Sequence, residues 1–142
     1  MTVPDLGLDG YVLEHQIGFL LRLANQRHLE VFAATVSEVT PTQFATLVKL
    51  KEAGVLSQNH LGRLVAMDAA TTKGVIDRLR KKGLVATRPS ASDLRRLDVS
   101  LTPAGDAFVN VLIPVARRIS AQTTRNLTAK EAVLLLALLQ KL

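Results

Sequence analysis

Residues 57–101 read SQNHLGRLVAMDAATTKGVIDRLRKKGLVATRPSASDLRRLDVSL, and this stretch decides the fold. Its first half predicts two helices separated by a short turn at residues 66–67. Ser57 and Asp68 stand where these helices begin, because a side-chain oxygen there accepts a hydrogen bond from a free backbone N–H. The second helix should end at Gly83, since glycine terminates helices readily. We expect its core-facing stripe to consist of Thr72, Val75, Ile76 and Leu79.

The hydrophobic pattern changes after Gly83 from helical spacing to the alternation of strands. Residues 84–88 and 97–101 predict two strands, and the Pro, Ser and Asp residues between them are typical of a turn. A helix, a turn, a second helix and a basic β-hairpin together make a winged helix-turn-helix. We therefore predict a mainly α fold, of the α+β type, built around this unit.

One long helix and one shorter helix are predicted before this unit. Apolar residues at helical spacing indicate a helix over residues 11–36, about 39 Å long at 1.5 Å per residue. Thr40 and Gln43 then form a capping box, in which each side chain bonds to the other residue's backbone. This box opens a helix that should stop at Gly54.

Two further helices are predicted after the hairpin. Residues 102–103, Thr-Pro, open the first, and Pro114 inside it should introduce a kink because proline lacks a backbone donor. A second capping box at residues 128–131 opens the last helix, which is apolar on every side over residues 132–139. A chain of 142 residues can hardly surround such a helix alone, so we expect a second copy to cover it.

These elements predict a single domain over residues 1–142. Residues 40–101 should form a winged helix-turn-helix lobe that binds DNA. The helices within residues 1–39 and 102–142 should form the interface of a homodimer.

The positive charge of the chain is concentrated in one segment. The whole sequence has a formal net charge of +6. Residues 57–96 hold nine basic and three acidic residues, which accounts for the entire net charge, while the rest of the chain is neutral. A basic segment that coincides with a winged helix-turn-helix favours a polyanionic partner, and double-stranded DNA in particular.

Several functional classes are disfavoured by the residue types. There is no cysteine, and His15, His28 and His60 lack the spacing of zinc sites. No nucleotide-binding or hydrolase motif is present, so we expect no metal, no cofactor and no enzymatic activity. No apolar run approaches the roughly 18 residues of a membrane span, and residues 1–6 lack the features of a signal peptide. We therefore expect no membrane partner and a cytoplasmic location.

The second helix of the unit is expected to lie in a DNA major groove. Its first turns present Thr71, Lys73 and Gly74, and we include Thr72 among the expected contacts although its spacing also places it in the core-facing stripe. We expect Arg95, at the hairpin tip, to enter a minor groove. The acidic residues Asp77 and Asp93 should pair with neighbouring arginines. Further DNA contacts are expected from Ser57, Gln58, Asn59, Arg78, Arg88 and Arg96.

The chain also resembles a known family. The motif Asp-x-Arg-Arg at residues 93–96, followed by Leu-Thr-x-x-Gly at residues 101–105, is similar to the MarR family of bacterial transcription regulators, as are residues 56–64, 77–85 and 88–89. The resemblance covers nearly the whole chain. It implies a homodimer that binds a pseudo-palindromic operator, represses adjacent genes and is released by a small phenolic or aromatic acid.

The resemblance also assigns roles by position. Thr71, Lys73 and Gly74 match the family's major-groove contacts, and Arg95 matches its wing-tip arginine. Gly74 is a departure, because the family often has a larger polar residue there. Direct base readout by a side chain at this position is therefore in question.

An effector pocket is implied between the dimerisation helices and the DNA-binding lobe. The polar residues of the first helix expected to reach it are His15, Arg22 and His28, since an arginine or a protonated histidine can hold a carboxylate. The alternative is that all three are surface or interface residues. Residues 22–28 and 57–63 are similar to members that govern aromatic-acid catabolism.

Together, these patterns predict a ligand-responsive, dimeric, DNA-binding transcription regulator. The expected form is a repressor released from its operator by a small aromatic or phenolic acid. The alternative is a winged-helix interaction module that binds RNA or protein. The affinity of such a module for DNA would change little with salt concentration, and the module would prefer no particular duplex.

Overall fold

The computed structural model describes residues 9–142. The beginning of the predicted dimerisation segment, residues 1–8, lies outside this range, as do the residues considered above for a signal peptide. In chain order the elements are the short 3-10 helix η1 (Leu13–His15), α1 (Ile17–Thr35), α2 (Pro41–Ala53), β1 (Val55–Ser57), α3 (Gln58–Leu64), α4 (Ala69–Lys81), β2 (Val85–Pro89), β3 (Leu97–Leu101), α5 (Pro103–Thr123) and α6 (Ala129–Leu139).

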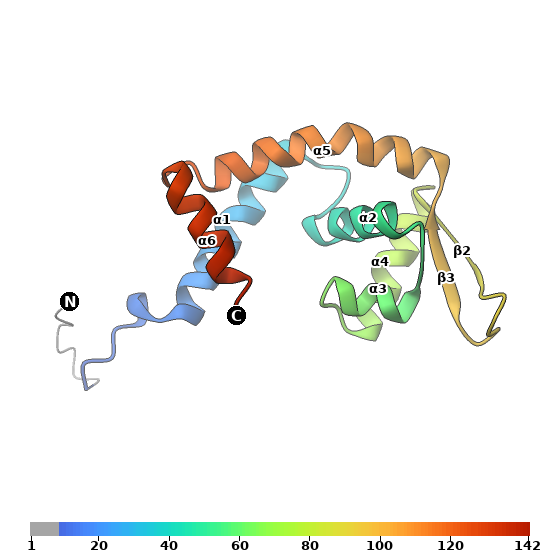
Figure 1. Cartoon of the computed structure of the whole chain (residues 1–142), viewed down its shortest axis with the longest axis horizontal. Coiled ribbons are helices and arrows are strands. Elements are labelled where there is room, and N and C mark those ends of the chain that lie inside the picture. The colour runs from blue at the N-terminus through green and yellow to red at the C-terminus, as the bar shows by residue number, and fades with distance from the viewer. Residues whose placement is uncertain (1–8) are drawn as a thin grey trace.

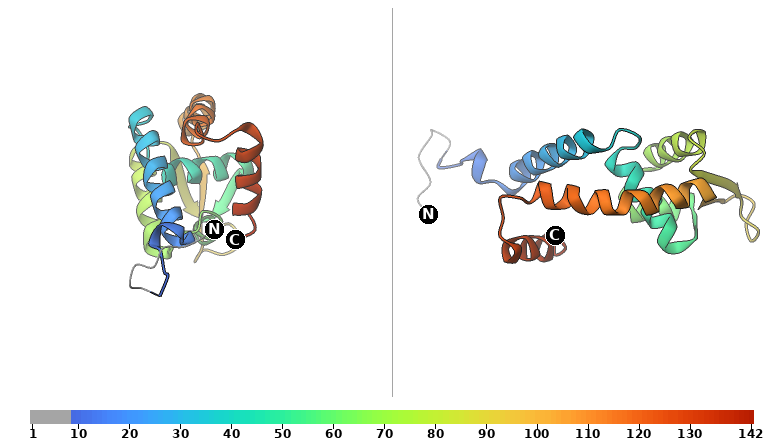
Figure 2. Two further views of the ribbon diagram at one scale, coloured as in Figure 1. Left: turned by 90° about the vertical axis from the view of Figure 1, so that its left-hand side faces the viewer. Right: turned by 90° about the horizontal axis from the view of Figure 1, so that it is seen from above.

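The long helix α5 joins two parts of the molecule (Figure 1). At one end, α2, α3 and α4 pack with the three strands into what we call the winged lobe, residues 41–101. At the other end, α1 and α6 descend from α5 on different sides of it (Figure 2). Helix α5 packs against α1 and also against α2, so it contacts both parts. The predicted mainly α class with a winged helix-turn-helix is confirmed.

Threonine caps begin three of the helices, as predicted. Thr40 Oγ1 accepts from the backbone N–H of Gln43 at 3.1 Å, and the Gln43 side chain accepts in return from Thr40 N–H at 3.2 Å. Thr128 and Glu131 form the same reciprocal pair at the start of α6. Thr102 Oγ1 accepts from Gly105 N–H at 3.0 Å at the start of α5. Both capping boxes read from the sequence are therefore confirmed.

A three-stranded antiparallel sheet forms one side of the winged lobe, in the order β1-β3-β2. The hairpin strands β2 and β3 lie within one residue of the predicted ranges and pair antiparallel, with Thr87 opposite Val99. Strand β1 was not predicted, because three residues are too few to show alternation. The centre of the core is fully buried and consists of Leu47, Leu50, Leu61, Ile76, Leu79, Val99 and Val109.

Two local expectations were wrong. The first helix is not continuous: Gln16 has extended backbone between η1 and α1, and its side-chain amide donates to Val12 O at 3.0 Å. The apolar period continues across this break, so the pattern could not reveal it. The helical spacing of Leu61, Leu64 and Val65 predicts that all three face the core, but Leu64 is exposed. Pro114 lies inside α5, which continues through it as one helix (Figure 1), and the kink expected there stays a prediction.

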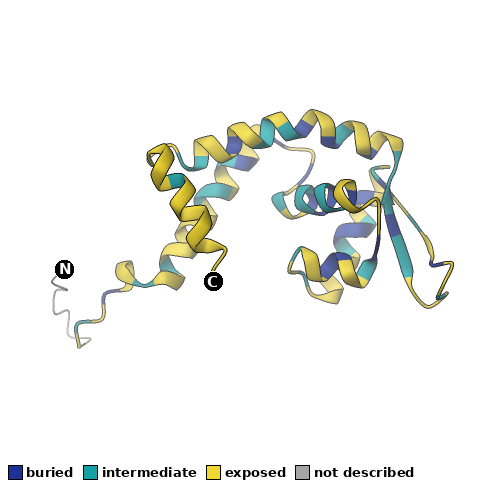
Figure 3. Cartoon of the chain, in the orientation of Figure 1, coloured by how far each residue is buried: buried dark blue, intermediate teal, exposed yellow. Residues whose placement is uncertain are grey.

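Helix α6 is left uncovered within one chain. None of its residues is buried, although its sequence is AKEAVLLLALL. Val133 and Leu136 have 69% and 60% of their surface exposed. Figure 3 shows α6 exposed along almost its whole length, whereas each helix of the winged lobe has buried residues on one side. An isolated chain therefore leaves a large apolar surface in water, which monomeric soluble proteins rarely do.

Within residues 9–142, no helix is both long enough and apolar enough to cross a membrane. The same part of the chain contains no cluster of three or more His, Asp or Glu side chains suited to a metal ion.

Candidate nucleic-acid interface

A close approach between α3 and α4 sets the geometry of the helix-turn-helix. A Cβ atom added at Gly62 would lie 2.5 Å from Thr72 Oγ1, so only glycine lets the two helices cross this closely. Ser57 Oγ accepts from His60 N–H at 3.2 Å and caps α3, as predicted. Asp68 Oδ1 accepts from Thr71 N–H at 2.7 Å and caps α4. This backbone hydrogen bond lowers the pKa of the Asp68 carboxyl below its ordinary value.

Helix α4 has one buried and one exposed face. The four residues predicted for the inward stripe, Thr72, Val75, Ile76 and Leu79, are all buried, which confirms that prediction. The opposite face, with Thr71 and Lys73, is open to solvent, and Gly74 is partly exposed. A groove of DNA can therefore approach the outward face of α4 without displacing core residues.

Thr72 does not fit its expected role as a direct DNA contact. It is 2% exposed, and its hydroxyl donates to Asp68 O at 2.7 Å. The helical period that places it in the core explains this burial. Thr72 thus supports the start of α4 and packs beside Gly62.

Most of the other predicted DNA contacts meet around one hollow. The hollow has a volume of about 290 Å³ and lies between the start of α3, the outward side of α4 and the base of the hairpin. Six of the predicted residues line it: Ser57, Gln58, Asn59, Lys73, Arg95 and Arg96. Asp77, Arg80 and Leu97 complete the lining, and Arg80 was not among the predicted contacts. We call this hollow the basic hollow. Its four cations and one carboxylate favour a phosphate group.

Asp77 organises the cations on α4. Its carboxylate accepts from Lys73 Nζ at 3.1 Å and from Arg80 at 3.3 Å, and Arg80 also donates to Thr87 Oγ1 at 3.2 Å. The hydrogen bond from Lys73, followed by the nearby positive charges, lowers the pKa of Asp77. The expected pairing of Asp77 with an arginine is confirmed, and the spacing Asp77-x-x-Arg80 could have indicated Arg80.

The hairpin tip holds Arg95 through an acidic neighbour. Asp93 Oδ1 accepts from the backbone N–H of Arg95 at 3.0 Å and from its Nε at 3.2 Å, which confirms the expected pairing. These two bonds lower the pKa of Asp93. The Arg95 side chain is nevertheless 92% exposed. It is therefore oriented by the protein and free on its outer side for a ligand.

Five predicted DNA contacts do not line the basic hollow: Thr71, Thr72 and Gly74, described above, and Arg88 and Arg78. Arg88 is exposed on β2, where it stands opposite Asp98 of β3. Arg78 is exposed on α4, on the side away from the hairpin, and its guanidinium lies over Gly74.

The three residues predicted to bind an effector are not gathered in one place. His15 lies exposed in η1, and Arg22 lies exposed on α1. His28 is half-buried, and its Nδ1 lies 2.9 Å from Thr123 Oγ1, which ties α1 to α5. Their proposed role in binding an effector stays a prediction.

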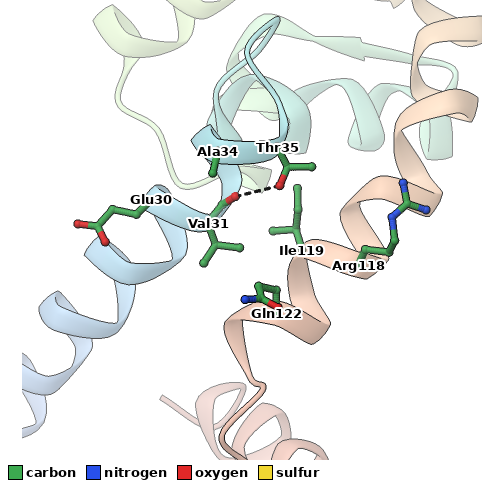
Figure 4. Close-up of a pocket in the computed structure, with 7 residues that line it drawn as sticks. All are labelled: Glu30, Val31, Ala34, Thr35, Arg118, Ile119 and Gln122. Carbon is green, nitrogen blue, oxygen red and sulfur yellow. Dashed lines mark hydrogen bonds between the residues drawn. The ribbon is translucent and has the colours of Figure 1, made fainter.

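Two other hollows adjoin α1. The first, of about 530 Å³, lies between α1 and α5 and is shown in Figure 4. Ile119 and Gln122 of α5 lie toward Val31 of α1 there, while Glu30 points away. The second, of about 620 Å³, lies between the end of α1, the α1–α2 loop and the end of α4, and we call it the hinge hollow. None of the three hollows is lined by His15, Arg22 or His28.

The hinge hollow combines an apolar wall with two cations. Phe32 and Val36 belong to the wall, and Arg78 and Lys82 approach from α4. Lys82 Nζ donates to Glu38 O in the α1–α2 loop, so the end of α4 is attached to the loop beside this hollow.

Comparison with known proteins places this geometry in a family. The MarR family model matches residues 39–97, from just before α2 to the start of β3. The repressor NicR of Pseudomonas putida is 40% identical to the chain over 134 residues, which are 93% of this chain and 85% of NicR. The chain belongs to the MarR family. Members of this family are DNA-binding transcription regulators and not enzymes, in agreement with the sequence-based expectation.

Two solved MarR-family structures superpose closely on the chain. BpsR of Bordetella bronchiseptica, whose DNA binding is regulated by 6-hydroxynicotinic acid, matches with a TM-score of 0.87 and 38% identity over 92% of this chain and 95% of BpsR. A MarR variant of Escherichia coli bound to operator DNA matches with a TM-score of 0.81 and 29% identity over 88% of this chain and 91% of that protein.

Proposed function

We propose that this MarR-family chain is a homodimeric transcriptional repressor that binds a pseudo-palindromic operator. The observation that carries the proposal is the basic hollow, where α3, α4 and the hairpin bring four cations together beside the exposed face of α4. A phosphate of the DNA backbone would lie in this hollow while α4 enters the major groove and Arg95 the adjacent minor groove. The relatives NicR, a repressor, and MarR, solved with operator DNA, support it.

The homodimer is supported by the uncovered apolar surface. Helix α6 has no buried residue, and α1 exposes Ile17, Leu20 and Leu23 on the same part of the molecule. Two copies that cover these surfaces would place two winged lobes on one side of the dimer. Two recognition helices should then meet half-sites about one helical turn apart, roughly 34–36 Å.

The operator can be found by selecting duplexes from a random DNA library. We expect a sequence with two inverted half-sites and an affinity that falls steeply with salt, because each neutralised phosphate contributes about −0.9 to the slope of log K against log salt. A flat salt response without any preferred duplex would favour the alternative module that binds RNA or protein.

We further propose that a small aromatic carboxylic acid releases the chain from DNA. The regulation of BpsR by 6-hydroxynicotinic acid supports a hydroxylated aromatic or heteroaromatic acid as the chemical class. The hinge hollow suits such a ligand, because Phe32 and Val36 offer an apolar wall and Lys82 offers charge for a carboxylate. A carboxylate that attracts Lys82 would compete with its bond to Glu38 O and so alter the attachment of α4.

Calorimetry with 6-hydroxynicotinic acid and simple hydroxybenzoic acids tests this site. In the hinge hollow, Lys82→Met should weaken binding while Arg22→Met leaves it unchanged. The reverse result would place the ligand near His15, Arg22 and His28, the residues predicted from the sequence. Absence of binding by all of these acids would contradict the proposed effector class.

A further inference from the structure

Gly74 is an unusual residue for the exposed part of a recognition helix. Glycine inside a helix costs about 0.5–1 kcal/mol relative to alanine, and the φ angle of Gly74 is not one that requires glycine. With about 100° between successive residues, the buried stripe of α4 lies opposite Ala70, Gly74 and Lys81. Gly74 therefore stands near the centre of the face that turns away from the core.

The space above Gly74 is occupied by the end of another side chain. A Cβ atom added at Gly74 would lie 3.2 Å from one terminal nitrogen of Arg78, 3.5 Å from the other and 3.6 Å from the guanidinium carbon. The guanidinium plane thus lies against the backbone of Gly74, one helical turn closer to the start of α4 than the Arg78 backbone. A side chain at position 74 would compete for this space.

In the part of the chain that the structure describes, Arg78 shares with Lys81 the lack of a side-chain partner and differs in this from four nearby cations. Lys73 and Arg80 both pair with Asp77, and Arg95 pairs with Asp93. Lys82 donates to Glu38 O. Within residues 9–142 the Arg78 guanidinium has no ion pair and no hydrogen bond. All of its donors are therefore available to a ligand on the outward face of α4.

We propose that Arg78 reads a base-pair edge in the major groove from the space above Gly74, so that Gly74 and Arg78 together set part of the sequence specificity. This inference rests on the proposed binding of operator DNA. The first turns of a recognition helix are the part that reaches base edges, and the folded-back guanidinium lies beside that part. Its planar fork matches guanine O6 and N7, which accept two parallel hydrogen bonds. Residue 74 itself contributes only its missing side chain, which leaves room for the Arg78 guanidinium.

The test compares base preferences of variants by selection from a random duplex library, followed by affinities for single-base variants of the preferred duplex. Arg78→Lys keeps the positive charge but loses the fork. It should reduce the discrimination at one base pair of each half-site by at least about fivefold, with an unchanged salt slope. Gly74→Ala favours the helix and therefore folds, yet it should reduce discrimination at the same base pair because it displaces the guanidinium. The double variant should lose no more than Arg78→Lys alone.

Lys81→Met is the matched control, because it removes a charge from the same face of α4 without a contact to Gly74. It should weaken binding equally for all sequences. The slope of log K against log salt should become less steep by the contribution of about one phosphate. The proposal is overturned if Arg78→Lys or Gly74→Ala leaves every base preference unchanged, or if Arg78→Lys weakens all duplexes equally. If the unmodified chain selects no sequence at all, the proposed function itself fails, and this inference fails with it.

Discussion

Asp93 binds both the backbone and the side chain of Arg95. Its Oδ1 accepts from the backbone N–H of Arg95 at 3.0 Å and from the side-chain Nε at 3.2 Å. An exposed arginine at the tip of a hairpin would otherwise sample many rotamers. The acid is therefore best understood as a positioning residue for the arginine rather than as a DNA contact, since a carboxylate near phosphates would be repelled.

This pair gives the first prediction. Arg95→Ala should weaken operator binding by about 1–3 kcal/mol if Arg95 contacts a specific site, because its hydrogen bonds and its charge are lost together. Asp93→Ala should also weaken binding, since it frees the arginine. The two losses should not add in the double variant, because Asp93 acts through Arg95. Fluorescence anisotropy at two salt concentrations measures the DNA affinity of the two single variants and the double variant. Fully additive losses of affinity would contradict a role of Asp93 through Arg95.

A second prediction concerns the cap of α4 and acid. The pKa of Asp68 is lowered in the folded chain by the Thr71 backbone hydrogen bond, so the ionised carboxylate stabilises the fold. This contribution is complete above the ordinary pKa of 3.8 and is lost as the pH falls through the lower value of the folded state. Asn is an equally good N-cap but does not titrate. Asp68→Asn should therefore lose less of its free energy of unfolding than the unmodified chain as the pH falls from about 5 to 3.

Urea unfolding at several pH values checks this difference. The other acids, including Asp77 and Asp93, titrate in both proteins and cancel in the comparison. Parallel curves for the two proteins across the acid range would show that the Asp68 cap carries no pH dependence.

A third prediction concerns Gly105, which packs directly on the backbone of Leu84. A Cβ atom at Gly105 would overlap the Leu84 carbonyl, and Thr102 N–H also donates to Leu84 O at 3.1 Å. Gly105→Ala should therefore destabilise the chain by about 1–3 kcal/mol through overpacking. Gly18→Ala is the matched control, because no heavy atom lies within 4 Å of a Cβ there. It should stabilise α1 by about 0.5–1 kcal/mol. Thermal unfolding that shifts in the same direction for both variants would be inconsistent with this packing.

A fourth prediction concerns the oligomeric state. Leu136 on α6 is 60% exposed in one chain, and Leu136→Asp places a charge in the proposed dimer interface. We expect light scattering at micromolar concentration to show a dimer for the unmodified chain and a monomer for this variant. Leu94→Asp at the hairpin tip, where the leucine is 81% exposed, should remain dimeric. A monomeric unmodified chain would refute the homodimer.

The patterns that follow a regular period or a capping rule were predictable from the sequence. The inward stripe of α4 follows the 3.6-residue repeat, and the Thr40 and Thr128 boxes follow a rule that involves only neighbouring residues. The break at Gln16 and strand β1 were not predictable in this way, because a single extended residue and a three-residue strand are too short to alter a period.

The site was predictable by residue type but not by arrangement. The residue types around the helix-turn-helix pointed to six of the residues that line the basic hollow, three of them basic and three polar. The sequence could not show that the Thr72 hydroxyl donates a hydrogen bond to Asp68 O. It also could not show that the Arg78 guanidinium folds back over Gly74. Both depend on the rotamer that a side chain adopts in three dimensions, and neighbouring residues in the sequence do not determine it.

Helix α5 has a mechanical consequence. Its 21 residues span about 32 Å, and it packs against α1 at one end and against α2 and the sheet at the other. A stiff rod of this length amplifies small rotations, because a tilt of about 5° at one end displaces the other end by about 3 Å. That displacement is nearly the spacing of one base pair along DNA, about 3.4 Å. A modest change in how two copies meet would therefore be enough to move a recognition helix out of register with its half-site.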